Sequence, residues 1–292
     1  MKRKNHAADI IIITFLGILA VISLFPFYQT LILSFSKLSD IGTQRIFLYP
    51  VSIDFSSYQY LFMEGKVIRG LLVTLFVTVF GTSLNMLVTT SGAYALSKKI
   101  LPGRDFILNA IIFTMFFSGG LIPFFLTVQS IGLQNNLFVM IFPTVVNTFY
   151  LILLKNFFRS ITPSLEESAK IDGANDIVIL LNIVLPVSKP IIAAISLFYA
   201  VDRWNEWWMA MIFINNTKLY PLQLVLRQTI INIAAVMTSS SISAAMASIY
   251  ESIYPESVKA AIIMLSTLPI LCVYPFLQKH FSAGIMVGSI KE

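Results

Sequence analysis

Charged residues are scarce in this chain. They make up 12% of its 292 residues, about half of the ~25% typical of soluble domains. Hydrophobic residues make up 57%, and the mean hydropathy is +0.83. A water-soluble protein of this composition would lack the polar groups to cover its surface, so lipid must supply the exterior. The composition excludes a cytosolic enzyme, a nucleic-acid-binding domain and a disordered chain.

Cysteine and histidine are nearly absent. The single cysteine, Cys272, lies in an apolar run, which excludes an intrachain disulfide framework or a cysteine-based metal site. His6 and His280 lie near the two ends of the chain, and neither has a partner at metal-ligand spacing. We therefore expect no metal site.

Motifs for enzymatic chemistry are also missing. There is no H-E-x-x-H and no G-x-S-x-G, which leaves protease or hydrolase chemistry without its residues. The only Gly-Lys pair, Gly65-Lys66, has Tyr60 where a phosphate-binding loop needs its first glycine. We expect that this chain is not an enzyme and hydrolyses no ATP itself.

Long apolar runs dominate what is present. Each run can cross ~30 Å of hydrocarbon as a helix that rises ~1.5 Å per residue. The predicted fold class is all-α, a polytopic membrane protein with six transmembrane helices. The six stretches are Ile10–Ser34, Leu71–Ser97, Phe106–Val128, Leu137–Phe158, Ile177–Tyr199 and Val258–Leu277.

Glycine and proline interrupt several of these stretches. Gly119-Gly120 followed by Pro123 predicts a break in the third, and Pro186 and Pro190 predict a bend in the fifth. The first stretch follows Lys2-Arg3-Lys4 as a signal peptide would. It is too long for a signal-peptide core and no A-x-A cleavage site follows, so we expect a retained span.

The distribution of Lys and Arg predicts the orientation. Short basic loops at Ser97–Asp105 and Lys155–Lys170 indicate the cytoplasmic side. The N and C termini are then both cytoplasmic, and the external loops cover about residues 35–70 and 204–257. The second loop contains Ser239-Ser240-Ser241, which we expect to form its tip. We expect one transmembrane domain over residues 1–292.

The predicted cytoplasmic connection at residues 162–174 has the features of a short surface helix. Ser164 and Glu167 fit a capping box, and Glu166 and Lys170 stand in the favourable i,i+4 order. Gly173 suits the left-handed position that ends a helix. These features predict a polar helix over residues 164–173, too short to cross the bilayer. An ordinary loop helix with good caps is the other interpretation.

A longer pattern that includes this helix resembles the EAA motif of ABC importer permeases. It consists of Glu167-Ser168-Ala169, then Asp172-Gly173, then Ile183-Val184-Leu185-Pro186. Ser168 replaces the middle alanine of the motif, a small-for-small change. The rest of the chain resembles permeases of carbohydrate importers related to the maltose system. The stretches that carry this likeness are Phe117–Pro123, Leu185–Ala193, Trp204–Trp207, Leu219–Arg227 and Tyr274–Lys279.

The resemblance implies the permease subunit of a type I ABC importer for oligosaccharides in the bacterial cell membrane. It implies a second homologous permease subunit, a pair of ATPase subunits that hold ATP and Mg²⁺, and an extracytoplasmic sugar-binding protein. The branch resembled includes permeases for uronate-containing cell-wall oligosaccharides. The resemblance makes residues 164–173 the coupling helix that docks on the ATPase. The coupling residues it implies are Glu167, Ser168, Ala169, Asp172, Gly173 and Pro186.

Aromatic and polar residues cluster after the fifth apolar stretch. Aromatic faces and hydroxyl-matching polar groups commonly bind sugars, so this cluster is a candidate substrate path or outer gate. An interfacial aromatic belt is the other interpretation, and Asp202, Arg203 and Glu206 offer an ion-pair network. The candidate residues are Tyr199, Trp204, Asn205, Glu206 and Trp208.

Two other functions are weighed against this one. A carrier driven by ion gradients would need coupling carboxylates within the spans, and the predicted spans contain none at depth. Within the ABC importers, a permease for a small polyol phosphate is the other alternative.

Overall fold

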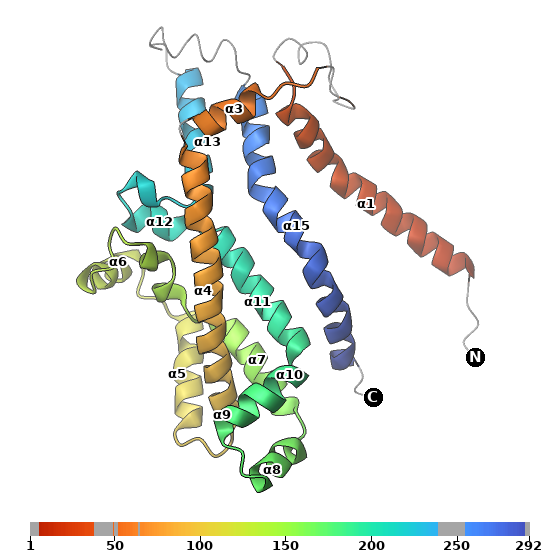
Figure 1. The fold of residues 1–292 in the computed structure, drawn as a ribbon, viewed down its shortest axis with the longest axis vertical. Coiled ribbons are helices and arrows are strands. Elements are labelled where there is room, and N and C mark those ends of the chain that lie inside the picture. Colours follow the sequence, from red (N-terminus) through yellow and green to blue (C-terminus); the bar gives the residue numbers. More distant parts are fainter. Residues whose placement is uncertain (1–5, 38–48, 50–51, 64, 239–254, 290–292) are drawn as a thin grey trace. The chain divides into compact units, whose positions relative to one another are not determined.

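The computed structural model describes residues 6–37, 49, 52–63, 65–238 and 255–289. Every regular element in these ranges is a helix, which confirms the predicted all-α class (Figure 1). Three helices are long and apolar enough to cross a membrane unbroken. They are α1 (His6–Ser34), α4 (Lys66–Ser97) and α15 (Pro255–Ser289).

Three further spans are broken into bent pairs of helical segments, which brings the candidate spans to as many as six. The third span bends by 120°, the fourth by 49° and the fifth by 88°. The third consists of α5 (Arg104–Phe116) and α6 (Leu121–Ser130). The fourth consists of η1 (Leu137–Met140), η2 (Phe142–Thr144) and α7 (Thr148–Ser160). The fifth consists of α9 (Asp176–Ile179), η3 (Leu180–Val184), α10 (Leu185–Val187), α11 (Lys189–Trp204) and α12 (Trp208–Phe213).

Each bend lies where the local sequence cannot continue a helix. Gly120 has φ 86° between α5 and α6, a conformation that glycine adopts without steric cost. The side chain of Asn147 accepts hydrogen bonds from the backbone N–H groups of Phe149 and Tyr150, so a new helix starts there. Pro190 stands in the first turn of α11, where its missing N–H is not needed. The predicted breaks at glycine and proline are confirmed, and the third span turns more sharply than a kink.

The chain divides into two compact units. The first comprises Met1–Val67 and Leu226–Pro269. In it, Asp54 accepts a 3.0 Å bond from the N–H of Ser56, the first residue of α3 (Ser56–Met63). The Tyr58 hydroxyl donates to Ser34 Oγ at 2.9 Å. Burial raises the pKa of Tyr58 above its usual value.

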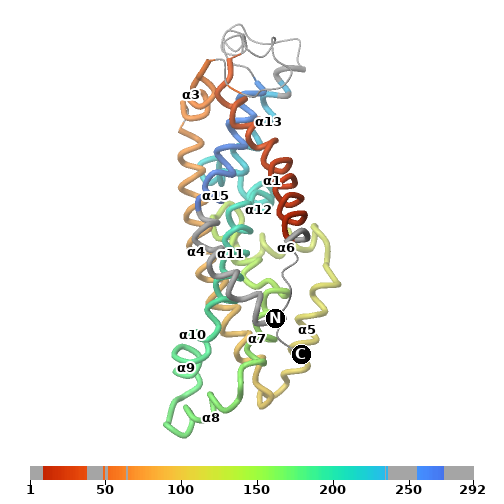
Figure 2. The backbone as a smooth tube through the Cα atoms, turned by 90° about the vertical axis from the view of Figure 1, so that its right-hand side faces the viewer, coloured from red at the N-terminus to blue at the C-terminus, as the bar shows by residue number. Residues whose placement is uncertain are grey.

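The second unit comprises Ile68–Val225 and Ile270–Glu292 and contains two apolar clusters. One surrounds Leu154, Ile195 and the last turn of α4, close to α8 (Pro163–Ile171). The other surrounds Val77, Met140 and Phe213 and packs α6, η1 and α12 together. Figures 1 and 2 show α8 at the foot of this unit, beside the end of α4 and below α9.

The expected loop from Trp204 differs from the structure. The fifth span does not end at Tyr199 but continues through α12 to Phe213. It is followed by η4 (Thr217–Leu219) and the 17-residue helix α13 (Leu222–Thr238). The first residues of α13 pack on α4, where Gly70 leaves room for Leu222 and the Leu222 N–H donates to Thr74 Oγ1 at 2.8 Å. The serine cluster at 239–241 lies outside the described residues, as does most of the expected loop near residue 40.

Candidate functional site

The surface helix predicted at 164–173 exists as α8, with different ends. It runs from Pro163 to Ile171, with Thr162 as its N-cap and no side-chain capping bond. The predicted capping box of Ser164 and Glu167 is therefore wrong. Proline favours the first helical position because an N–H would be unpaired there, and it places the N-cap at Thr162, two residues before Ser164.

The C-terminal end of α8 is confirmed in detail. Gly173 has φ 84°, the left-handed conformation that the sequence predicts. Its N–H donates to the carbonyl of Lys170 at 3.0 Å, and the N–H of Ala174 donates to the carbonyl of Ala169 at 2.9 Å. This pair of bonds is the Schellman motif, which satisfies the last carbonyls of a helix. Gly173 turns the chain from α8 towards α9.

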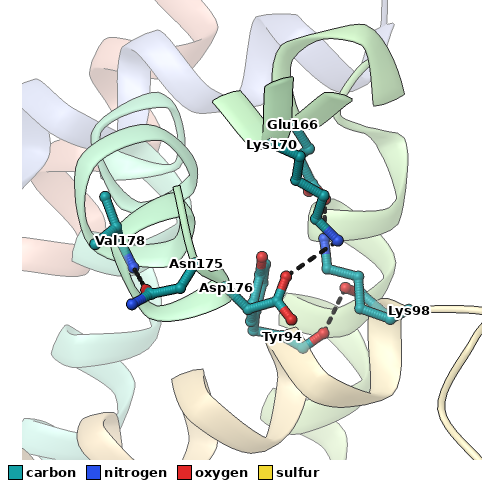
Figure 3. Close-up of polar contacts among 8 residues, drawn as sticks. Tyr94, Lys98, Glu166, Lys170, Asn175, Asp176 and Val178 are labelled. Carbon is teal, nitrogen blue, oxygen red and sulfur yellow. Dashed lines mark hydrogen bonds and ion pairs between the residues drawn. The ribbon is translucent and has the colours of Figure 1, made fainter. Parts of the chain in front are cut away.

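Two ion pairs fasten α8 to its neighbours (Figure 3). Glu166 pairs with Lys98, the residue after α4, and Lys170 pairs with Asp176 in α9 at 3.2 Å. The predicted i,i+4 pair between Glu166 and Lys170 is therefore wrong. Glu166 and Lys170 each pair with a residue outside α8 instead of with each other. The i,i+4 spacing within the helix does not reveal these partners.

The faces of α8 differ in burial. Ala169 is buried in the apolar cluster with Leu96, so it anchors α8 to its own chain. Leu165 and Ile171 are exposed, the latter by 87%. The predicted coupling residues Glu167, Ser168 and Asp172 are also exposed, as are Gly173 and Pro186. The outward face thus combines apolar and acidic groups, whereas Ala169 is not available to a docking partner.

Pro186, the remaining predicted coupling residue, lies in α10 after the π-helical segment η3. The C-cap of α10 is Ser188, and the span bends there by 88° into α11. Ser188 is fully buried, and its N–H donates to the carbonyls of Val184 and Leu185. Pro186 therefore lies within the bent span and not on α8.

A second site surrounds Arg203, in the last turn of α11. Only 4% of this arginine is exposed. Its guanidinium donates to the backbone carbonyls of Met140 and Thr144, and to Thr144 Oγ1 at 2.8 Å. Its Nε donates to Asn85 Oδ1 at 3.2 Å. These carbonyls are at the break of the fourth span, where the helix leaves them unpaired, so Arg203 replaces the missing helical donors.

Two further side chains hold the same break. Asn85 Nδ2 donates to the carbonyls of Thr144 at 3.1 Å and Val145 at 2.8 Å. The hydroxyl of Tyr199 lies 2.7 Å from Thr89 Oγ1 and accepts a 2.9 Å bond from the N–H of Asn147. Tyr199 is 2% exposed. Side chains of α4 and α11 thus fix the start of α7.

A pocket of about 300 Å³ opens beside these residues within the second unit. This volume is at the lower end of the range of small-molecule sites, about 300–1,000 Å³. Its walls come from the break of the fourth span and the end of α11. The lining residues are Pro143, Thr144, Val146, Asn147, Tyr199, Asp202, Arg203 and Glu206.

The predicted aromatic cluster is only partly brought together. Tyr199 and Glu206 line the pocket, whereas Trp204, Asn205 and Trp208 are not among its lining residues. Trp204 is buried, and Trp208 is 45% exposed. The Asn205 side chain donates to the Val201 carbonyl of its own helix at 2.9 Å.

The charged residues of this cluster have separate partners. Asp202 accepts a bond from the Tyr150 hydroxyl at 3.1 Å, and Glu206 accepts one from the Met209 N–H at 2.9 Å. Arg203 donates to the broken span instead of joining the two acids in a network. Both carboxylates lie in the helical pair that runs to Phe213, beyond the predicted end of the fifth span at Tyr199.

Sequence reasoning missed the residues that hold the fourth span. Asn85 lies in the middle of an apolar span, and an amide there needs partners. Asn147 precedes an apolar helical run, which is the pattern of an N-cap. Both signals are in the sequence, but neither indicates that Asn85 meets Arg203 or that the Asn147 N–H meets the Tyr199 hydroxyl.

Apolar helices long enough to span a bilayer, with a polar pocket at a broken span, define a helical membrane transport protein. No protein-family model matches the chain. Among curated proteins, it is 42% identical over 290 residues to the polygalacturonan/rhamnogalacturonan transport system permease protein YtcP of Bacillus subtilis strain 168, covering 99% of both chains. It is 40% identical to protein LplC of the same organism, covering 99% of this chain and 96% of LplC.

A solved structure shows the same fold. It is a chain from the crystal structure of a bacterial ABC transporter involved in the import of the acidic polysaccharide alginate. The TM-score is 0.84 at 36% sequence identity, and the match covers 96% of this chain and 99% of that chain. The chain therefore belongs to the family of permease proteins of carbohydrate ABC importers.

Proposed function

We propose that this chain is the membrane-spanning subunit of an ATP-driven importer that translocates uronate-containing oligosaccharides. The similarity to YtcP over 99% of both chains supports this substrate class, as does the similarity to a transporter involved in alginate import. A binding protein outside the membrane delivers the oligosaccharide. A second permease subunit completes the path, and two ATPase subunits supply the energy.

We further propose that α8 is the coupling helix and that it faces the cytoplasm, together with both termini. The single observation that carries this assignment is a short polar helix, closed by the left-handed Gly173, whose exposed face holds Glu167, Ser168 and Asp172. The groups on that face suit a docking cleft with basic and apolar residues. Lys98, Arg104 and Arg159 lie near the same end, as the positive-inside rule expects of a cytoplasmic surface.

The pocket beside Arg203 is the proposed contact with the substrate. It has room for one sugar ring, and the carboxylates of Asp202 and Glu206 can accept hydrogen bonds from sugar hydroxyls. The donors of Arg203 are already engaged with the broken span. The pocket therefore suits the hydroxyl-bearing face of a sugar better than a uronate carboxylate, which the two acids would repel.

Purification of the tagged chain from its native membrane tests this function. We expect an ATPase and a second permease to co-purify. ATP hydrolysis by this complex should rise when the binding protein is added with a galacturonan or alginate oligosaccharide, and should not rise with the binding protein alone. Recovery of a chain without an ATPase would contradict the proposal. Stimulation by a neutral oligosaccharide and none by the acidic ones would contradict the substrate class alone.

A further inference from the structure

The end of α4 and the start of α8 are joined by one partly buried ion pair. Lys98 follows the last residue of α4, and Glu166 lies in the first turn of α8. The side chains are 23% and 18% exposed. Because water screens such a pair less than a surface pair, its attraction is stronger. The two helices are far apart in sequence, so this contact is made by the tertiary structure.

The ammonium group of Lys98 is held by a second contact. It lies 4.2 Å from the centroid of the Tyr94 ring, within the range of a cation–π interaction. Tyr94 in turn packs edge-to-face on Phe158 of α7, with ring centroids 6.4 Å apart. The end of α4 is itself fixed, since Arg104 Nε donates to the Leu96 carbonyl at 2.9 Å. Lys98 thus extends from a rigid base to α8 (Figure 3).

The other ion pair of α8 is different in kind. Lys170 and Asp176 are 54% and 67% exposed, and they join α8 only to the next segment of the chain, α9. Exposed pairs of this sort contribute little, because water competes for both groups. Among the described residues, Lys98 and Glu166 form the ion pair that links α8 to a long transmembrane helix.

We propose that the Lys98–Glu166 pair is a positioning link, which makes the end of α4 follow α8 when the ATPase subunits move. The inference depends on the proposed function of α8 as the coupling helix. Ala169 also packs in an apolar cluster with the end of α4. Apolar contacts are non-directional, so they resist sliding of α8 along α4 only weakly. The ion pair is directional, because the Lys98 ammonium is held over the Tyr94 ring, and it therefore fixes where the start of α8 lies relative to the end of α4.

The test measures oligosaccharide uptake and ATP hydrolysis in the same vesicles, with the complete importer. Lys98→Gln and Glu166→Gln should each lower the uptake per ATP hydrolysed by about fivefold or more, the lower range of coupling between distant sites. The reversed pair, Lys98→Glu with Glu166→Lys, should restore most of the ratio because it restores the attraction. Asp176→Asn is the matched control, and it should leave the ratio unchanged.

An unchanged ratio in both single variants would overturn the link. So would a loss of assembled complex with normal uptake per ATP in what remains, because that outcome indicates a purely structural role. The wild-type complex tests the proposed function separately. If wild type shows no stimulated hydrolysis and no uptake, the proposed function fails, and the ratio of uptake to ATP hydrolysed cannot be measured in the variants.

Hydrogen exchange keeps the link testable without a substrate. In the membrane-embedded chain, Lys98→Gln should speed amide exchange over 163–171, and Asp176→Asn should not. Equal exchange in wild type and Lys98→Gln would overturn the proposal even if the importer had a different substrate.

Discussion

Arg203 and Lys98 are both cations at the C-terminal end of a transmembrane helix, where the helix dipole favours positive charge. Their partners differ. Arg203 is 4% exposed and donates mainly to backbone carbonyls and an amide. Lys98 is partly exposed and pairs with one carboxylate on another helix. Backbone carbonyls cannot move without rearranging the span, whereas the side chains of an ion pair can follow a movement of α8. The bonds of Arg203 therefore fix the break of the fourth span, and the Lys98–Glu166 pair suits a contact between two helices that move.

The largest expected effect comes from the fixed site. Arg203→Met would remove the arginine's bonds to the Met140 and Thr144 carbonyls and to Thr144 Oγ1, while the Thr144 carbonyl keeps its bond from Asn85. We therefore expect a loss of about 3–5 kcal/mol or no accumulation of folded chain. Arg203→Lys should fall between this variant and wild type, because an ammonium keeps the charge but not the planar set of donors. Thermal unfolding of the purified complex measures both. Wild-type stability of Arg203→Met would show that water or other groups satisfy the break.

The next effect concerns the end of α8. Gly173→Val forces a β-branched residue into φ 84°, at a cost of about 1–2 kcal/mol or more. We expect the chain to insert normally, while ATP-driven uptake falls by about tenfold. Gly173→Asn is the matched control, because asparagine tolerates this conformation and should retain most of the uptake. No atom lies within 4 Å of an added Cβ, so the conformation and not the space decides. Normal uptake by Gly173→Val would refute the coupling assignment.

A smaller effect sharpens the account of Arg203. A Cβ added at Gly81 would lie 3.1 Å from Arg203 Cδ, and the arginine is bonded too firmly to yield. Gly92→Ala is the matched control, since its Cβ meets only the flexible end of Leu151 at 3.4 Å. Both changes gain about 1 kcal/mol of helix propensity in α4. We expect Gly81→Ala to be the less stable by about 1–2 kcal/mol, and equal unfolding midpoints would contradict a tightly held arginine.

The smallest effect concerns Tyr94, beneath Lys98. Its hydroxyl is buried and makes no hydrogen bond to any described residue. Tyr94→Phe removes this group and keeps the ring that faces the Lys98 ammonium. Stability should stay the same or rise by at most about 1 kcal/mol, since an unpaired buried hydroxyl is unfavourable. The unfolding midpoint checks this, and a clear loss of stability would show that the hydroxyl has a partner.

The sequence predicts local features of this protein well. Apolar runs locate the spans because lipid requires about 20 apolar residues in a helix. Gly119-Gly120 and Pro190 locate breaks because the conformational freedom of glycine and the fixed φ and missing N–H of proline act wherever these residues occur. The left-handed Gly173 is predicted for the same reason. Predictions of which side chain bonds to which partner are less accurate. The capping box at Ser164 and the pair of Glu166 with Lys170 are both reasonable by spacing, and both are replaced in the structure.

The amino-acid sequence by itself determined that this is an all-α membrane protein with interrupted spans and a short polar helix. Hydropathy, chirality and helix caps act within a few residues, so they can be read along the chain. Only the tertiary structure decided the contacts between segments. It directs Arg203 to the carbonyls of the fourth span and Glu166 to Lys98, across separations of 59 to 68 residues. A buried charge takes the partner that lies nearest in space, and spacing in the sequence does not specify which one that is.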